Sequence, residues 1–423
     1  MGTGIRRIVR AVLAGSLVFG GALSAAVIGG ALPASAASVV QTIYVGGRPE
    51  GVSSDGSHVW VANEGNLVEL NASTGALIQT IGVGSFPFGV SSDGIHVWVA
   101  SYGDNTVTEL NASDGSPVRS TPVGSSPAGV SSDGTHVWVA NEYSNTVTEL
   151  NASTGAAVQT IGVGSLPFAV LSDGIHVWVA NYGDATVTEL NASTGAVVQT
   201  LTLGSGSSTQ SISSDGTHVW VADWGGYTVT ELDASTGAVV RTIGGFAAPT
   251  ALASDGTNVW VANENSNTVT ELNASTGAAV QSIGVGNVSG GVSAHGSHVW
   301  VGNSDDGTVT EIEDFAVVPP TEPLLGIEGK PWPPDALQIE GSDVSTPPYV
   351  TTFKWHKVSL PQGLKLSSAG VLSGTPNKKL TPGTTSITVQ VTQTVTTLNG
   401  NKKVKTKTTV QSTIPLTIVS SNS

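Results

Sequence analysis

Short runs in which hydrophobic and polar residues alternate fill most of the chain, and they return in the same order many times. Alternation with a period of two predicts β-strands, because successive side chains of a strand point to opposite faces. The third repeat contains four such runs: Ala128–Ser132, His136–Ala140, Thr146–Leu150 and Ala156–Val163. Asp133-Gly134 between the first two runs is typical of a two-residue hairpin turn. Each repeat therefore predicts four antiparallel strands.

One tryptophan stands at the same place in the second strand of every repeat. The spacing between successive tryptophans is 38 to 42 residues, at Trp60, Trp98, Trp138, Trp178, Trp220, Trp260 and Trp300. A fixed period near 40, built from short strands and turns, is typical of blades arranged around an axis. The sequence predicts an all-β protein whose first domain is a seven-bladed β-propeller with four-stranded blades. We expect the tryptophans to pack between neighbouring blades.

The last repeat lacks a fourth strand, and the N-terminal segment supplies a candidate for it. The seventh repeat departs from the pattern at Glu313–Phe315. Ser38–Val45 reads like the fourth strand of the third repeat. We therefore expect Ser38–Val45 to pair with Thr308–Ile312, which closes the ring and removes the open sheet edges that would otherwise promote aggregation.

The repeats resemble the YVTN family of β-propeller repeats. The resemblance covers Ser38 to about Asp314 and rests on Trp-Val-Ala-Asn in the second strand, the Asp-Gly turn before it and Thr-Val-Thr-Glu in the third strand. It implies a propeller that serves as a scaffold, as a binding module or occasionally as an enzyme. Related propellers are used by lyases that act on macrocyclic antibiotics and by sugar lactonases.

Residues 1–36 have the composition of an export signal. Three arginines between positions 6 and 10 precede the apolar run Ala11–Gly30, and Ala34–Ala36 provides the small residues that signal peptidase requires. We expect cleavage before Ala37 and a secreted or cell-surface bacterial protein with no membrane span in its mature form. An uncleaved anchor is the alternative, because the apolar run is about as long as a membrane span.

The propeller is expected to occupy residues 37–318, and a second domain to follow it. Residues 319–323 are rich in proline and predict a stiff linker. Leu-Pro-Gln-Gly-Leu at 360–364 and Gly-Val-Leu-Ser-Gly-Thr-Pro at 370–376 resemble the Ig-like domain family of bacterial surface proteins. This resemblance implies that residues 324–423 form a β-sandwich that acts as a spacer or adhesion module. Alternation in Thr385–Thr397 and Val404–Val419 predicts a final hairpin around Asn399-Gly400.

The propeller segment is strongly acidic. Residues 37–318 contain 26 Asp and Glu against three Arg, whereas residues 319–423 contain ten Lys against five acids. An acidic domain repels phosphates, so we expect no nucleic-acid partner. Four lysines near the tip of the final hairpin are candidates for contact with anionic cell-wall polymers, or for protection of an edge strand. They are Lys402, Lys403, Lys405 and Lys407.

Histidine and glutamate also recur at fixed positions. The histidines are His58, His96, His136, His176, His218 and His298, with Asn258 in the remaining repeat. The glutamates are Glu69, Glu109, Glu149, Glu189, Glu231, Glu271 and Glu311. Copies spread around a ring away from its axis do not converge on one metal ion. We interpret them as repeated structural hydrogen bonds, and we expect no metal ion, no cofactor and no catalytic residue. A ring of metal ligands or acid–base pairs is the alternative.

An Asn-Ala-Ser sequence recurs in the turn between the third and fourth strands. It begins at Asn71, Asn111, Asn151, Asn191 and Asn273, and Asp233 takes this place in the fifth repeat. A turn that accepts either residue uses the side-chain oxygen to accept backbone hydrogen bonds. N-glycosylation of these sequences is the alternative.

The repeats differ mainly in the loop between the second and third strands and in the connection to the next repeat. Up-and-down strands place both segments at the same end of the ring, and loops on a rigid scaffold usually carry binding specificity. We predict ligand-binding residues in these loops. The candidates are Tyr102, Tyr143, Tyr182, Trp224, Tyr227, Asp104, Glu142, Asp184 and Asp223. Phe86, Phe88, Leu166, Phe168 and Phe246 come from the inter-repeat connections.

Aromatic, amide and carboxylate groups around a concave mouth suit a carbohydrate, a peptide or a cationic ligand. The sequence therefore favours a monomeric, exported, non-catalytic protein that binds an extracellular carbohydrate, peptide or protein. A lyase or lactonase that acts on a small cyclic ester or sugar lactone is the alternative. His295 is the propeller's histidine outside the repeated position, and it stands where the other repeats have the Asp of the hairpin turn.

Overall fold

A computed structural model describes residues 35–204, 208–287 and 290–318, together with strands between residues 324 and 419. The predicted leader up to residue 34 and the predicted linker lie outside the described residues. The chain divides into two compact units, of which one is Ala37–Asp314 and the other contains the strands that follow Phe315. Among the described residues, no helix has the length and apolar character needed to cross a membrane.

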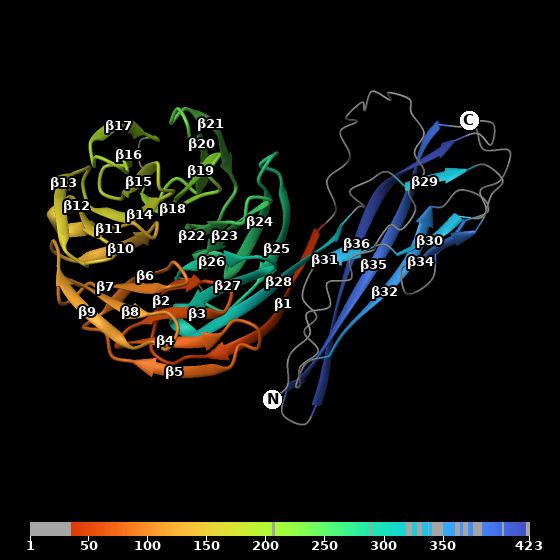
Figure 1. The fold of residues 1–423 in the computed structure, drawn as a ribbon, viewed down its shortest axis with the longest axis horizontal. Coiled ribbons are helices and arrows are strands. Elements are labelled where there is room, and N and C mark those ends of the chain that lie inside the picture. The colour runs from red at the N-terminus through yellow and green to blue at the C-terminus, as the bar shows by residue number, and fades with distance from the viewer. Residues whose placement is uncertain are drawn as a thin grey trace. The chain divides into compact units, whose positions relative to one another are not determined.

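Ala37–Asp314 forms a seven-bladed propeller, as predicted, and each blade is an antiparallel sheet of four strands (Figure 1). The first blade contains β2 (Pro49–Ser54), β3 (His58–Asn63), β4 (Asn66–Asn71) and β5 (Leu77–Ile81). The second contains β6 (Pro87–Ser92), β7 (His96–Ser101), β8 (Thr106–Asn111) and β9 (Pro117–Pro122). The third contains β10 (Pro127–Ser132), β11 (His136–Asn141), β12 (Thr146–Asn151) and β13 (Ala157–Gly162). Predicted and observed strand ends in this third blade differ by at most one residue.

The remaining blades repeat this order. The fourth contains β14 (Pro167–Ser172), β15 (His176–Asn181), β16 (Thr186–Asn191) and β17 (Val197–Thr202). The fifth contains β18 (Thr209–Ser214), β19 (His218–Asp223), β20 (Thr228–Asp233) and β21 (Val239–Gly244). The sixth contains β22 (Pro249–Ser254), β23 (Asn258–Asn263), β24 (Thr268–Asn273) and β25 (Ala279–Gly284). The seventh contains β26 (Val292–His295), β27 (His298–Asn303), β28 (Thr308–Val318) and β1 (Ser35–Tyr44). Three short 3₁₀ helices lie in loops: η1 (Glu142–Ser144), η2 (Glu264–Ser266) and η3 (Ser304–Asp306).

The turns follow the residues that predicted them. In the third blade, the carboxylate of Asp133 accepts hydrogen bonds from the backbone N–H groups of Thr135 and His136, at 2.9 and 2.7 Å. Between β12 and β13, Asn151 Oδ1 accepts hydrogen bonds from the Thr154 backbone and from two hydroxyl groups. Asp233 accepts the equivalent bonds in the fifth blade. The structural interpretation of this Asx turn is therefore confirmed.

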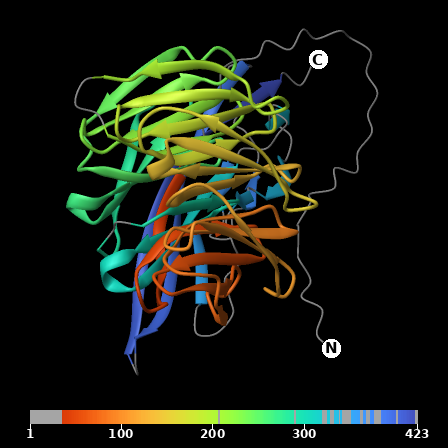
Figure 2. The same ribbon diagram turned by 90° about the vertical axis from the view of Figure 1, so that its left-hand side faces the viewer.

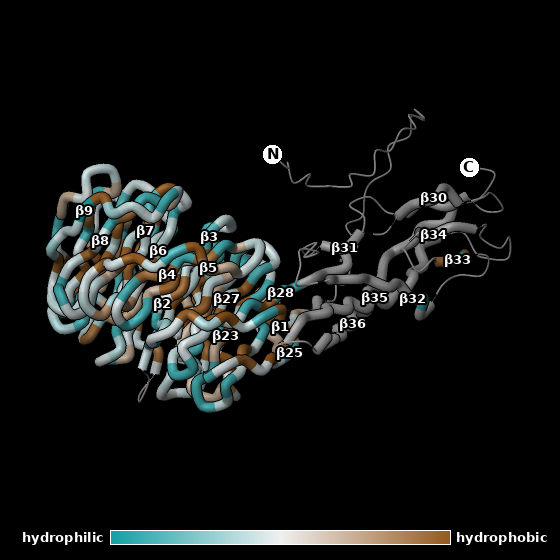
Figure 3. The backbone as a smooth tube through the Cα atoms, turned by 90° about the horizontal axis from the view of Figure 1, so that it is seen from below, coloured by the Kyte–Doolittle hydropathy of each residue, from teal (hydrophilic) through white to brown (hydrophobic). Residues whose placement is uncertain are grey.

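The first strand of each blade lies at the centre of the ring and the fourth at its outer edge (Figure 1). Serine side chains join neighbouring inner strands, because Ser53 Oγ accepts a hydrogen bond from the Ser92 N–H at 3.0 Å. The contact repeats where the ring closes, since Ser293 Oγ accepts one from the Ser54 N–H at 3.0 Å. Hydrophobic residues lie mainly within the blades, whereas many turns are hydrophilic (Figure 3).

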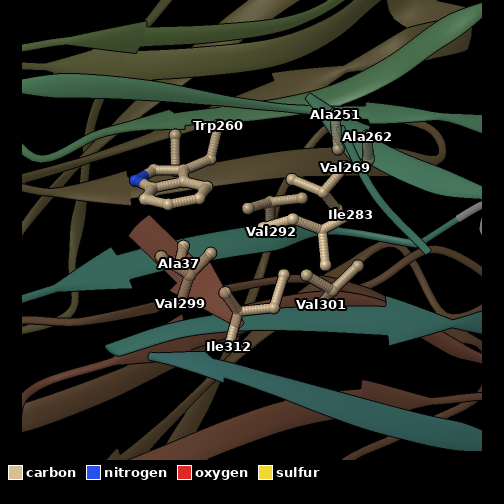
Figure 4. Packing of buried hydrophobic residues seen from close by; sticks show 11 residues of the cluster. Ala37, Ala251, Trp260, Ala262, Val269, Ile283, Val292, Val299, Val301 and Ile312 are labelled. Carbon is tan, nitrogen blue, oxygen red and sulfur yellow. The ribbon is translucent and has the colours of Figure 1, made fainter. Parts of the chain in front are cut away.

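Each of the seven repeated tryptophans is fully buried and packs into the core of the blade that follows it. Trp60 of the first blade lies in a cluster with Val97, Val99 and Leu110 of the second. Trp260 of the sixth lies in a cluster with Val299, Ile312 and other residues of the seventh (Figure 4). The predicted packing between blades is confirmed. Because a buried indole contributes a large apolar area, these residues are a main source of inter-blade cohesion.

The N-terminal strand closes the ring, as predicted, because β1 pairs with β28. Figure 2 shows the red β1 beside the teal strands of the last blade. Gln41 Nε2 donates a hydrogen bond to Glu311 Oε2 at 2.6 Å and another to the backbone oxygen of Thr74 at 3.1 Å. Gln41 thereby links the seventh blade to the first. Gln159 makes the same two bonds inside the ring, to Glu149 at 2.6 Å and to the Thr194 oxygen at 3.1 Å.

The second unit is also built from strands. One sheet has the order β29 (Leu324–Ile327), β36 (Lys402–Val419), β35 (Gly383–Asn399) and β32 (Val350–Ser359). Another has the order β30 (Trp332–Ala336), β34 (Val371–Gly374) and β33 (Leu364–Leu366). β31 (Gln338–Glu340) pairs with Ala316–Val318 at the end of β28. The predicted final hairpin is present, with Asn399 opposite Lys402.

We predict that Gln41→Ala and Gln159→Ala each lower the free energy of unfolding by about 1–3 kcal/mol, because each removes the hydrogen bond donated to one carboxylate oxygen of a buried glutamate. Equilibrium urea unfolding measures this loss. The two variants should differ in the local opening of β1. Gln41 lies on β1 itself, whereas Gln159 lies on β13, far from it in the ring. Hydrogen exchange at β1 should accelerate in Gln41→Ala, whereas Gln159→Ala leaves it unchanged. Equal exchange at β1 in both variants would contradict this role of Gln41.

Candidate functional site

The variable loops meet at one end of the propeller. The Tyr102 and Gly103 N–H groups donate hydrogen bonds to the backbone oxygens of Phe86 and Ser85, at 2.9 and 3.0 Å. These bonds join the loop between β7 and β8 to the connection between β5 and β6. Tyr182 makes the equivalent bond to Leu166 at 2.9 Å, and Trp224 to Ser208 at 3.0 Å. The two loop types therefore brace each other and form a single loop-rich face.

A cavity of about 320 Å³ opens on this face. Residues of the first four blades line it: Arg48, Glu50, Glu64, Phe86, Pro87, Phe88, Tyr102, Glu142 and Phe168. Glu50, Phe88 and Phe168 occupy the same position, the second residue of an inner strand, in blades 1, 2 and 4. Ala128 holds this position in the intervening third blade and is fully buried. We call this site the mouth cavity.

Aromatic rings form a continuous wall in the mouth cavity and beside it. The rings of Phe88 and Phe168 meet edge to face, with their centroids 5.2 Å apart. They meet across the third blade because Ala128 is too small to separate them. Tyr102 lies 6.1 Å from Phe88 and 6.1 Å from Tyr143, and Tyr182 lies 6.2 Å from Phe168. Five rings from three blades thus form a continuous chain of contacts, which fixes the wall before any ligand arrives.

Two acidic residues of the mouth cavity have raised pKa values. Burial raises the pKa of Glu142, and a hydrogen bond from the Tyr102 hydroxyl opposes part of that rise. Burial also raises the pKa of Glu50, while the nearby Arg48 guanidinium lowers it. Arg48 Nε lies 3.5 Å from Glu50 Oε1, and its Nη2 lies 3.3 Å from Asp305 Oδ1. The cavity therefore holds three glutamates and one arginine that is already paired.

The Tyr102 hydroxyl has several hydrogen-bond partners in and beside the mouth cavity. It interacts with Glu142, Tyr143 and Ser126. Burial is the main cause that raises the pKa of its phenol well above the usual range, and the bond with Tyr143 and the charge of Glu142 add to the rise. Tyr102 therefore stays protonated at neutral pH and can donate to the Glu142 carboxylate.

The structure brings some of the predicted site residues together and uses others to hold the loops. Tyr102 and Glu142 line the mouth cavity, and Tyr143 and Tyr182 contact its aromatic wall. The carboxylates of three predicted residues accept backbone hydrogen bonds at 2.7 or 2.8 Å: Asp104 from Ser85, Asp184 from Ser165 and Asp223 from Ser208. Their first role is to fix the loop conformation.

The remaining two predicted residues belong to the fifth blade. Trp224 Nε1 donates a hydrogen bond to Glu264 Oε2 at 2.8 Å. Tyr227 is 51% exposed and has a backbone φ of 57°. Neither residue lines the mouth cavity.

Three charged cavity residues escaped the sequence prediction, Arg48, Glu50 and Glu64, and so did Pro87. The sequence held a signal for Arg48, because the other two propeller arginines, Arg119 and Arg241, stand at equivalent positions of fourth strands. In the structure these two pair with repeated glutamates at 2.8 and 2.7 Å. Arg48 alone of the three stands in a connection between blades.

Five of the six repeated histidines lie within individual blades, between two carboxylates, whereas His298 Nδ1 lies 2.8 Å from Glu311 Oε1. His58 Nδ1 lies 3.7 Å from Asp55 Oδ2, and its Nε2 lies 3.6 Å from Glu69 Oε1. The geometry repeats at His96, His136, His176 and His218. In the part of the chain that the structure describes, no group of three or more histidine, aspartate or glutamate residues is arranged to hold a metal ion. His295 lies opposite His298 in the hairpin formed by β26 and β27.

The contact between the sixth and seventh blades departs from this repeat. Asn258 replaces the histidine, and its Nδ2 donates a hydrogen bond to Asp314 Oδ2 at 2.9 Å. Burial raises the pKa of Asp314 to about 7, and the neighbouring Glu271, Asp255 and Glu313 add to the rise. Asp314 stands where the first blade has the buried Ala72, since both residues donate a backbone bond to the adjacent hairpin turn. This carboxyl therefore titrates near neutral pH.

Two family models match parts of the chain. The family described as "Outer membrane protein assembly factor BamB" matches residues 31–168, and the family described as "Putative Ig domain" matches residues 329–417. The second match agrees with the predicted Ig-like domain. The YVTN resemblance stays a prediction, because the propeller match is to another repeat family. The search of curated proteins found no match.

Solved structures share the propeller fold. Hydrazine synthase of Kuenenia stuttgartiensis is 18% identical with a TM-score of 0.57, over 63% of this chain and 95% of that one. Virginiamycin B lyase of Staphylococcus aureus is 15% identical with a TM-score of 0.56, over 66% and 99% of the two chains. A streptogramin B lyase is 15% identical with a TM-score of 0.57, over 66% and 98%. At these identities the likeness shows the fold alone.

We predict that Asp314 makes the protein less stable as the pH rises from about 4 to about 7. A folded-state pKa raised to about 7 from 3.8 means that the native state binds a proton that the unfolded state has lost. Asp314→Asn should match the wild type at about pH 3, below the unfolded-state pKa, and exceed its unfolding free energy by about 2–4 kcal/mol at pH 8. Urea unfolding at the two pH values measures this. An unchanged pH dependence in Asp314→Asn would disprove it.

Proposed function

We propose that this protein is an exported, non-catalytic binding protein that uses the loop-rich face of its propeller. The observation that carries the proposal is the mouth cavity, where aromatic rings and carboxylates from four blades line one concave site. Ligand sites are typically concave and largely apolar, with a few polar groups that fix orientation. The mouth cavity has this composition.

The rigidity of the site supports a binding role. The aromatic wall is fixed by ring–ring contacts, and the loops are braced by backbone hydrogen bonds and by the carboxylates of Asp104 and Asp184. A site that is already ordered loses little conformational entropy when a ligand binds. Loops on a rigid scaffold are also the usual place for binding specificity.

Export and an extracellular partner belong to the same proposal. The arginines, apolar run and small residues of 1–36 support a cleaved signal, and the similarity of residues 31–168 to a family of outer membrane protein assembly factors fits an exported chain. The partner is an extracellular carbohydrate, peptide or protein. The Ig-like domain serves as a spacer or contacts cell-wall polymers through the lysines of its final hairpin.

An enzyme that opens a small cyclic ester or lactone is the second candidate. Glu142 favours it, because a half-buried carboxyl with a raised pKa and a hydrogen bond from Tyr102 suits a general acid or base. The fold shared with virginiamycin B lyase is compatible with this activity but does not establish it. Ring opening of a cyclic ester or a sugar lactone by the wild type, lost in Glu142→Gln, would favour the enzyme over the binding protein.

The binding proposal predicts that the full chain co-sediments with insoluble cell walls or polysaccharides and that changes in the loop-rich face weaken this. Tyr143→Ala and Phe168→Ala should each reduce the bound fraction at least threefold, because each removes an aromatic contact surface worth about 1 kcal/mol. Ile95→Ala is the matched control, since Ile95 is 70% exposed in a hairpin turn at the opposite end of the blade. The lysines of the final hairpin, Lys402, Lys403, Lys405 and Lys407, are changed to Ala in every protein compared, so that the second domain does not contribute. Sedimentation that persists in both loop variants on this background would refute binding by this face.

A further inference from the structure

The aromatic wall of the mouth cavity presents π-faces and edges to a single small space. Phe88, Phe168 and Tyr102 are half-buried, so part of each ring remains accessible from the cavity. The Phe88 centroid lies 5.2 Å from that of Phe168 and 6.1 Å from that of Tyr102. A cation is attracted to an aromatic face when it lies within about 6 Å of the ring centroid. Rings this close together can act on the same cation.

Carboxylates surround the aromatic wall. Glu50, Glu64 and Glu142 line the cavity, and Asp305 lies beside it through its contact with Arg48. These four acids outnumber the single cation Arg48. An anionic ligand would face this excess of negative charge, whereas a cationic ligand would gain from it.

The net negative charge of the whole propeller adds a longer-range electrostatic potential that also attracts cations. Residues 37–318 contain 26 acidic residues, three arginines and no lysine. Arg119 and Arg241 are neutralised by buried glutamates on outer strands. A uniformly acidic domain raises the local concentration of cations around its clefts.

We propose that the mouth cavity binds a compact organic cation, an alkylammonium group, between its aromatic wall and its glutamates. This inference rests on the proposed binding function and names the chemical class of the ligand. The cation is held at the rings of Phe88, Phe168 and Tyr102, and Glu142, which is hydrogen-bonded to Tyr102, supplies a half-buried negative charge. Recognition combines cation–π attraction with a charge pair, and each is strengthened by partial exclusion of water.

The size of the cavity favours a small group over an extended chain. Ligand pockets span about 300–1,000 Å³, and the mouth cavity, at about 320 Å³, lies at the lower end. It fits one ammonium head group with its substituents. That group can belong to a free small molecule or to a lysine side chain of a peptide, and the two sources share the same recognition chemistry.

Arg48 allows a charge-dependent mode of binding to be distinguished from a purely hydrophobic one. Its guanidinium pairs with Glu50 and Asp305 at the edge of the cavity and therefore competes with an incoming cation. Removal of its charge should strengthen the binding of a cation and weaken the binding of an anion. No purely hydrophobic mode of binding predicts this pair of opposite effects.

The test is calorimetric titration of the full chain with three probes of nearly equal shape: choline, the neutral 3,3-dimethylbutan-1-ol and the anion 3,3-dimethylbutyrate. We expect choline to bind at least tenfold more tightly than the alcohol, because cation–π and charge attraction together exceed about 1.4 kcal/mol. The anion should bind most weakly. A peptide that contains trimethyllysine is the fourth probe, and binding tighter than that of choline would identify a peptide as the source.

Three variants test the location of the site and separate the contribution of cation–π attraction from that of charge. Phe88→Leu keeps an apolar side chain but removes the π-face, and should weaken choline binding about fivefold without weakening that of the alcohol. Glu142→Gln should weaken choline binding about tenfold. Arg48→Gln should strengthen it about threefold. Thermal unfolding of each variant, with an unchanged midpoint, verifies that the fold is intact.

Two results would overturn the inference. Equal affinity for choline and the neutral alcohol would show an apolar site, which leaves the binding function intact but removes the cation. The absence of any heat with choline or the trimethyllysine peptide would exclude a cation of this class. Because co-sedimentation tests the binding function separately, failure of that function and failure of the cation proposal can be told apart.

Discussion

The closure of the ring by β1 is the contact on which the rest of the structure depends. β1 is far in sequence from β28, yet it supplies the outer strand of the seventh blade. Its side chains enter two inter-blade cores: Ala37 and Val39 pack between blades 6 and 7, and Ile43 packs between blades 7 and 1 together with Val45, which follows the strand. Without β1, the edge of β28 and part of both cores would face water.

Closure also explains how variable loops can form a defined site. Each blade packs its tryptophan into the next, so the positions of the loops follow from the ring and not from the loop sequences. The mouth cavity combines residues from Arg48 to Phe168, which belong to four different repeats. The residue at one repeated position decides whether each blade contributes charge, an aromatic ring or space to the cavity. Glu50, Phe88, Ala128 and Phe168 occupy this position in blades 1 to 4.

Much of the fold could be predicted from the sequence because its signals are local and are repeated seven times. The Asp-Gly turn, the β-branched second strand and the buried tryptophan each specify local structure, and the resemblance of Ser38–Val45 to a fourth strand predicted the closing strand. The candidate site was harder to predict. Asp104 and Asp184 looked like ligand groups, but their carboxylates hold neighbouring backbone N–H groups.

The cavity residues of the first blade were missed because their role depends on tertiary structure. Arg48 precedes the first repeat, Glu50 lies on its inner strand and Glu64 lies in the turn between β3 and β4. No local pattern shows that these three residues share one cavity with Phe88 and Phe168. That arrangement depends on the ring geometry and on the small volume of Ala128. The pairing of Asn258 with Asp314 was likewise not predicted, because it joins two single departures from the repeat in different blades.

The central claim is that the propeller binds its ligand at the mouth cavity. ¹⁹F NMR of the full chain labelled with fluorophenylalanine, titrated with choline, tests it most directly. The account predicts that the resonances of Phe86, Phe88 and Phe168 shift on titration, whereas that of Phe246, which is buried in the core with Trp220, does not. Shifts at Phe246 with no change at the three cavity residues would contradict it.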